Sequence, residues 1–124
     1  MSTDVGAFAE FTDGRMCVIG VGGREIGIAR WNGTVYAVSN RCPHQNGPVC
    51  AGILSGRLTA GAPGQLELDA EVPILACPWH GWEFDLRTGK ALHDLRHRLH
   101  IFPVRVENGR TLVDLGTASK VAMG

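Results

Sequence analysis

The chain has 124 residues, 44% of them hydrophobic, which is enough for about one domain with an ordinary buried core. Its 12 basic and 12 acidic residues cancel, so charge gives no reason to expect binding to nucleic acid or to a charged membrane surface. No segment approaches the roughly 18 continuous apolar residues of a membrane span, and residues 1–10 hold no Lys or Arg and no apolar core of signal-peptide length, so we expect a single cytoplasmic domain over residues 1–124.

The first third of the chain predicts three short strands at residues 16–20, 25–31 and 34–39, which are apolar or alternating runs rich in Val and Ile. Gly22-Gly23 separates the first two runs. Asn32-Gly33 separates the second and the third, and Asn-Gly is the two-residue signal of a type I′ hairpin. These signals predict a meander of antiparallel strands.

The middle of the chain predicts an added surface hairpin, in which residues 57–60 and 65–68 flank the Gly/Pro cluster at residues 61–64. Loops accept such additions at low entropic cost. We assign residues 53–73 to this insertion, and its composition is compatible both with a docking surface and with an inert addition.

The last part of the chain predicts four more strands, at residues 74–76, 82–85, 101–107 and 111–115. A turn at residues 87–90 follows the second of them, and Asn108-Gly109 joins the last two as another hairpin. Residues 116–124 predict a frayed tail. The whole pattern predicts an all-β fold, an antiparallel sandwich or partly open barrel of about eight to ten short strands.

Two short motifs, Cys42-Pro43-His44 and Cys77-Pro78-Trp79-His80-Gly81-Trp82, each offer one thiolate and one imidazole. The candidate metal ligands are therefore Cys42, His44, Cys77 and His80. A zinc ion would take all four on one tetrahedron, whereas a [2Fe-2S] cluster of the Rieske type takes both Cys on one iron and both His on the other. Zinc modules usually pair like residues in each loop. The mixed loops therefore favour the cluster, and a zinc-stabilised binding module stays the alternative from another class of protein.

The segments Cys-Pro-His-Gln-Asn-Gly-Pro at residues 42–48 and Cys-Pro-Trp-His-Gly-Trp-Glu-Phe-Asp at residues 77–85 resemble the two cluster-binding loops of Rieske proteins. The resemblance runs from about residue 26 to residue 115, and it is closest to the Rieske-type ferredoxins of ring-hydroxylating oxygenase systems. It implies a Rieske-type fold with both cluster-binding loops at one end. It also implies one [2Fe-2S] cluster per chain, held by Cys42, His44, Cys77 and His80.

The chain departs from the pattern of some family members at three places. High-potential Rieske proteins of respiratory complexes brace their loops with a disulfide, and the two positions here are Gly47 and Trp79. They also place a Ser after the second His-Gly, where this chain has Trp82. Related ferredoxins often shield the cluster with a Pro-containing loop, whereas Ala91 and Leu92 stand here without a Pro. We therefore expect a reduction potential low in the Rieske span of about −150 to +300 mV.

The resemblance implies an electron carrier, because sulfide, Cys and His fill every iron position of a Rieske cluster and none is left for a substrate. We expect a ferredoxin that passes electrons from a flavin-containing reductase to a terminal oxygenase, with no substrate site of its own. Rieske oxygenases carry a second domain with a mononuclear iron, and too few residues follow His80 to form one. The alternative among redox proteins is a small Rieske subunit or accessory domain of another oxidoreductase, such as nitrite reductase.

Two cysteines, Cys17 and Cys50, are not used by this ligand set. We expect both to be small buried thiols, and a disulfide between them is the alternative. The three histidines His93, His97 and His100 have helical spacing, but no Cys or Glu completes a ligand set, so we assign no second metal site to them.

Residues 87–110 carry a local excess of positive charge. Two acids, Asp94 and Glu107, stand against the six basic residues of this stretch, which are Arg87, Lys90, Arg96, Arg98, Arg105 and Arg110. This predicts a basic surface that steers an acidic partner and changes mainly the association rate and its salt dependence.

Overall fold

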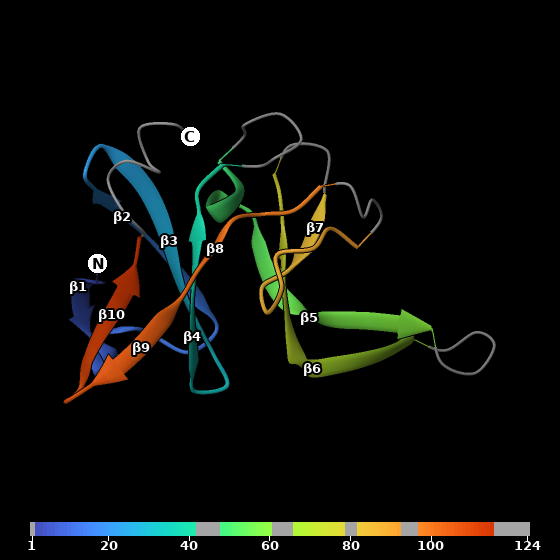
Figure 1. The fold of residues 1–124 in the computed structure, drawn as a ribbon. Helices are drawn as coiled ribbons and strands as arrows, with labels where there is room; N and C mark the ends of the chain where they lie inside the picture. Colours follow the sequence, from blue (N-terminus) through green and yellow to red (C-terminus); the bar gives the residue numbers. More distant parts are fainter. Residues whose placement is uncertain (1, 42–47, 61–65, 79–81, 93–96, 116–124) are drawn as a thin grey trace.

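The computed structural model describes residues 2–41, 48–60, 66–78, 82–92 and 97–115, which form ten β-strands, two 3-10 turns and no α-helix (Figure 1). The strands are β1 (Ser2–Ala7), β2 (Arg15–Val21), β3 (Arg24–Trp31), β4 (Thr34–Ser39), β5 (Ile53–Ala60), β6 (Leu66–Ala76), β7 (Glu83–Asp85), β8 (Ile101–Phe102), β9 (Val104–Glu107) and β10 (Arg110–Asp114). The 3-10 turns are η1 (Phe8–Glu10) and η2 (Val49–Ala51). No helix in these ranges has the length and apolarity needed to cross a bilayer. The all-β prediction is confirmed.

The central sheet has the strand order β2-β3-β4-β8, with every pair antiparallel. The turn between β3 and β4 has φ of 49° at Asn32 and 79° at Gly33. Positive φ at both central residues defines a type I′ turn. This turn type is favoured in two-residue hairpins because its backbone twist matches that of the flanking strands. The hairpin predicted from Asn32-Gly33 is therefore confirmed.

A second sheet, in the order β1-β10-β9, joins the two ends of the described chain. Its hairpin turns over Asn108 and Gly109, as predicted, with φ of 50° and 77°. The single strand predicted over residues 101–107 was wrong. Two strands stand there, β8 in the central sheet and β9 in this one, and Pro103 separates them because it has no N–H to continue a ladder.

In the third sheet, in the order β5-β6-β7, strand β6 ends directly before Cys77, the first residue of the second candidate ligand motif. The ladder between β5 and β6 shifts register at Gly56/Arg57, where Gly56 pairs with Pro73 and Arg57 pairs with Asp69. Beyond this shift the two strands run away from the rest of the molecule as a two-stranded ribbon (Figure 1). Its strands pair up to Ala60 and Leu66, and residues 61–65, including the whole predicted Gly/Pro cluster, lie outside the described residues. That residues 53–73 are an insertion stays a prediction.

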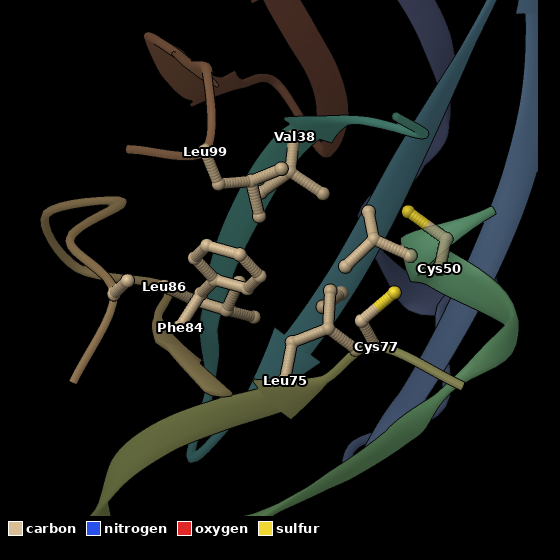
Figure 2. Close-up of a cluster of buried hydrophobic side chains, with 10 residues drawn as sticks. Val38, Cys50, Leu75, Cys77, Phe84, Leu86 and Leu99 are labelled. Carbon is tan, nitrogen blue, oxygen red and sulfur yellow. The ribbon is translucent and has the colours of Figure 1, made fainter. Parts of the chain in front are cut away.

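The core has two clusters, one on each face of the central sheet. Along β3, Ile28 belongs to one cluster and Ala29 to the other, and along β4 the same holds for Ala37 and Val38. Successive side chains of a strand point to opposite faces, so this sheet is covered on both sides. The cluster that faces the third sheet includes Leu75, Phe84, Leu86 and Leu99 (Figure 2). It fixes the third sheet against the central one.

Candidate metal centre

Cys77 is the candidate ligand that lies within the described residues, and Cys42, His44 and His80 lie outside them. Cys77 directly follows β6 and is 2% exposed. It belongs to the buried cluster of Figure 2, together with Cys50. The strand predicted at residues 74–76 is the end of β6, so the sheet delivers this thiol to the interior as expected.

The second ligand motif is closed at its base by the backbone. The N–H of Cys77 donates a hydrogen bond of 2.7 Å to the carbonyl oxygen of Trp82. The strands on either side continue this closure, because Ala76 at the end of β6 pairs with Glu83 at the start of β7. The segment that contains His80 therefore starts and ends on a paired ladder.

The first ligand motif is closed at its base by a side chain. Asn40 directly follows β4, and its Oδ1 accepts a hydrogen bond of 2.8 Å from the backbone N–H of Cys50 in η2. The turn η2 also bonds itself to the end of the loop, since the N–H of Ala51 donates to the carbonyl oxygen of Pro48. The two ends of residues 41–49, the segment that includes Cys42 and His44, are therefore held together.

The bases of the two motifs pack directly on each other. A Cβ added at Gly52, which follows η2, would overlap the carbonyl oxygen of Ala76 and lie 3.1 Å from Pro78 Cδ. This close approach requires a residue without a side chain at Gly52. It brings the chain leaving the first motif against the chain entering the second. Two motifs with one thiol and one imidazole each therefore start from neighbouring positions, and this donor set fits a Rieske cluster.

The sequence model of the Rieske-like [2Fe-2S] domain matches residues 2–114 of the chain. The chain belongs to this family. A Rieske [2Fe-2S] cluster is therefore the cofactor of this domain, and the match favours the cluster over the alternative of a zinc ion.

Curated relatives of this Rieske domain include ferredoxin components of oxygenase systems. The ferredoxin component of an alkene monooxygenase system from Xanthobacter autotrophicus is 31% identical over 110 residues, which cover 89% of this chain and 78% of that one. The ferredoxin component of a naphthalene 1,2-dioxygenase system from Pseudomonas putida is 30% identical over 110 residues, covering 88% and 90%.

Solved structures with the same fold include the ferredoxin of carbazole 1,9a-dioxygenase from Nocardioides aromaticivorans IC177. Its TM-score is 0.72 at 24% identity, covering 91% of this chain and 96% of that one. A protein from Mycobacterium tuberculosis, assigned as the small subunit of an NADH-dependent nitrite reductase, has a TM-score of 0.73 at 24% identity, covering 91% and 93%. Both likenesses bear on the fold, and they confirm the predicted Rieske-type architecture.

The two cysteines outside the candidate ligand set of this Rieske domain have different environments. Cys50 is 5% exposed, and this burial, with a smaller contribution from the charge of Glu25, raises the pKa of its thiol to about 12. Cys17 is exposed on β2, a strand at the edge of the central sheet, so the prediction that both thiols are buried was wrong for Cys17. Neither cysteine is in a disulfide. The alternative of a Cys17–Cys50 bridge is therefore wrong as well.

The predicted basic surface is partly neutralised by acids that lie outside residues 87–110. Arg110 pairs with Asp4 at 3.0 Å, and Arg87 pairs with Asp85 at 2.8 Å. Arg105 pairs at 3.2 Å with Glu107, one of the two acids already counted within residues 87–110. Lys90 and Arg98 are exposed and lie opposite each other in an isolated bridge, whereas Arg96 lies outside the described residues. The local excess of charge is therefore smaller than the sequence count indicates.

The histidines of the C-terminal half pack on aromatic rings in the described part of the chain. The ring of His97 meets the indole of Trp82 edge-on, with 4.9 Å between ring centroids, and the ring of His100 lies 4.5 Å from that of Phe102. His93 lies outside the described residues. The two described imidazoles thus contact different aromatic rings. Phe84 lies in the core and Trp82 packs against it, as predicted.

Proposed function

We propose that this Rieske domain is a ferredoxin, which carries single electrons from a flavin-containing reductase to a terminal oxygenase of the ring-hydroxylating type. The observation that carries the proposal is the similarity to ferredoxin components of oxygenase systems over most of both chains, 78% and 90% of the relatives' own lengths. A Rieske cluster suits this role because it accepts and releases one electron and leaves no iron position for a substrate.

Four residues are proposed as the ligands, with Cys42 and Cys77 on one iron and His44 and His80 on the other. The burial of Cys77 and the packing of the two motif bases on each other support this assignment. The protein is proposed to act as one domain over residues 1–124 in the cytoplasm.

The burial of Cys77 also bears on the direction in which electrons leave. Its sulfur belongs to an apolar cluster that separates it from solvent, so a partner reaches the cluster from the opposite side. His44 and His80 are therefore proposed as the exit for the electron. Pro48 and Pro78, which lie at the bases of the two motifs, are exposed and available for contact with a partner.

The alternative role is that of a small Rieske subunit of another oxidoreductase, as in a nitrite reductase. The structural similarity to the protein from Mycobacterium tuberculosis is compatible with this alternative. At 24% identity, that similarity shows a shared fold and does not show a shared role. Both roles use the same cluster and differ in the protein that receives the electron.

The function is tested by reconstitution with redox partners. The purified protein should be coloured and contain two iron and two acid-labile sulfide per chain. It should restore product formation when added to a flavin-containing reductase and a ring-hydroxylating oxygenase from the same genomic neighbourhood. A colourless protein with one zinc would overturn the cluster. A coloured protein that supports nitrite reduction and no hydroxylation would favour the alternative role.

A further inference from the structure

Asn40 is the residue through which the first ligand motif is tied to the central sheet. It makes three hydrogen bonds to other described residues. Its backbone N–H donates to the carbonyl oxygen of Glu25 at 3.1 Å, and its side-chain Nδ2 donates to Glu25 Oε1 at 3.2 Å. Its Oδ1 accepts from the backbone N–H of Cys50 at 2.8 Å. One side chain thus links β3, the end of β4 and the turn η2.

The position of these bonds gives Asn40 its importance for the metal centre. Asn40 stands two residues before Cys42, and Cys50 stands six residues after His44. The bond between Asn40 and Cys50 therefore fixes the distance between the two ends of the segment that supplies both ligands. Closing a loop in advance removes conformational entropy that binding of the ligand would otherwise have to overcome.

The chemistry of the carboxamide explains why an Asn suits this position. The carbonyl oxygen of the side chain faces an N–H, and its NH₂ group faces a carboxylate, so the two contacts fix the orientation of the amide. An Asp could accept the bond from Cys50, but it could not donate to Glu25. It would instead place a second negative charge beside that carboxylate, which costs free energy.

We propose that Asn40 is a positioning residue for the [2Fe-2S] cluster, which holds the first ligand motif in the conformation that keeps Cys42 and His44 on the irons. This inference rests on the assignment of Cys42 and His44 as ligands under the proposed function. The second motif does not depend on a side chain for its closure. The backbone pairing of β6 with β7 and the hydrogen bond from Cys77 to Trp82 already close its base.

The test measures how fast the cluster is lost from the holoprotein. Each variant is mixed with excess iron chelator well below its melting temperature, and the decay of visible absorbance is followed. Asn40→Ala should release iron about tenfold faster than the wild type, which is the effect of losing roughly one part-buried hydrogen bond. Asn40→Asp should release it comparably fast, because the link to Glu25 is replaced by repulsion.

A reversed pair supplies the rescue. In the double variant Asn40→Asp with Glu25→Gln, the new carboxylate accepts from Cys50 and from the new amide, so both links return with the same total charge. Release should fall back to within about twofold of the wild-type rate. The electron paramagnetic resonance signal of the reduced cluster should be broadened in Asn40→Ala and regain its wild-type width in the double variant.

A matched control separates positioning from general stability. Asp13 accepts hydrogen bonds from the backbone N–H groups of Asn32 and Gly33, at the far end of the β3–β4 hairpin. Asp13→Ala should lower the melting temperature without changing the rate of iron release. Equal release from Asn40→Ala and the wild type, or equal acceleration by Asp13→Ala, would overturn the role of Asn40. Neither result touches the proposed function, which fails only if the wild-type protein carries no [2Fe-2S] cluster or transfers no electron to its partners.

Discussion

The backbone N–H of Cys77 points at the carbonyl oxygen of Trp82, 2.7 Å away, so the second ligand motif is closed by the chain itself. The first motif is closed differently, by the side chain of Asn40 on Cys50. A single substitution can therefore weaken the base of the first motif, whereas the backbone closure of the second remains. This difference makes the two halves of the centre separable by mutation.

Replacement of Cys77 should remove the cluster and lower stability together. Cys77→Ala takes away one proposed ligand and leaves a small cavity in the buried cluster, and the free energy of metal binding is part of the free energy of folding. We expect a colourless protein with less than half of the wild-type iron and a lower melting temperature. Cys17→Ala, at an exposed thiol, is the control and should keep both colour and stability. Full iron content in Cys77→Ala would remove Cys77 from the ligand set.

Gly27→Ala should destabilise the fold beside the metal centre. A Cβ at this position would overlap the Sγ of Cys50 and lie 2.8 Å from Met16 Sδ, so the side chains of η2 and β2 must move. Such overpacking costs about 1–3 kcal/mol. Gly20→Ala, on the neighbouring strand and with open space at its Cβ, should change stability by less than about 0.5 kcal/mol. Chemical denaturation of both variants measures the difference, and equal stabilities would contradict the packing at Gly27.

Local sequence signals predicted the hairpins and indicated the candidate ligand motifs, because each of these features is encoded by neighbouring residues. Asn32-Gly33 and Asn108-Gly109 adopt the positive φ that their residue types favour. The strand β1 was not predicted, because Asp4 and Gly6 interrupt any regular alternation in it. It forms through pairing with β10 at the other end of the chain, supported by the ion pair between Asp4 and Arg110.

Partners that lie far apart in the sequence also explain why the positive charge of residues 87–110 was overestimated. A count over residues 87–110 includes Arg110 but not Asp4, its partner in the folded chain. Likewise, the motif Cys42-Pro43-His44 shows which atoms could bind a metal, but not that Asn40 and Cys50 close the segment that carries them. Contacts between distant residues have no local signal, so only the structure reveals them.

Alkylation of thiols should distinguish the two cysteines outside the ligand set. At pH 8 the exposed Cys17 should react with iodoacetamide, whereas Cys50 should stay unmodified because it is buried and protonated. Its pKa is raised to about 12, so the reactive thiolate stays scarce even as the pH rises from 8 to 10. Mass spectrometry of the intact holoprotein should find one label per chain. A second label at Cys50 under these conditions would contradict its burial.

The reduction potential should lie in the lower third of the Rieske range, between about −150 and 0 mV. The cluster gains one negative charge on reduction, and the apolar surroundings of Cys77 disfavour that charge. Trp82 follows the second His-Gly and offers no hydroxyl to a cluster sulfur, while its ring is turned to His97. Protein-film voltammetry measures the midpoint. A value well above zero would show that other dipoles near the cluster outweigh these effects.

The exposed side chain of Ile53 should contribute to docking of the redox partner. Ile53 is 71% exposed and pairs across the ladder with Ala76, the residue directly before Cys77, so it lies at the cluster end of the third sheet. Apolar side chains near the centre of an interface are among those whose loss costs about 1 kcal/mol or more. Ile53→Ser should therefore raise the KM for the partner about fivefold, with the cluster and its potential unchanged.

The control for Ile53 is Val106, which is 45% exposed on β9 in a different sheet. Val106→Ser also removes exposed apolar surface, although less of it than Ile53→Ser, and should leave the KM for the partner unchanged. Arg98→Ala should slow association at low salt and have little effect at high salt, because exposed charges act mainly by steering. Stopped-flow reduction by the reductase and oxidation by the oxygenase measure both directions. If Ile53→Ser matches Val106→Ser in both, the partner contacts the domain away from the start of β5.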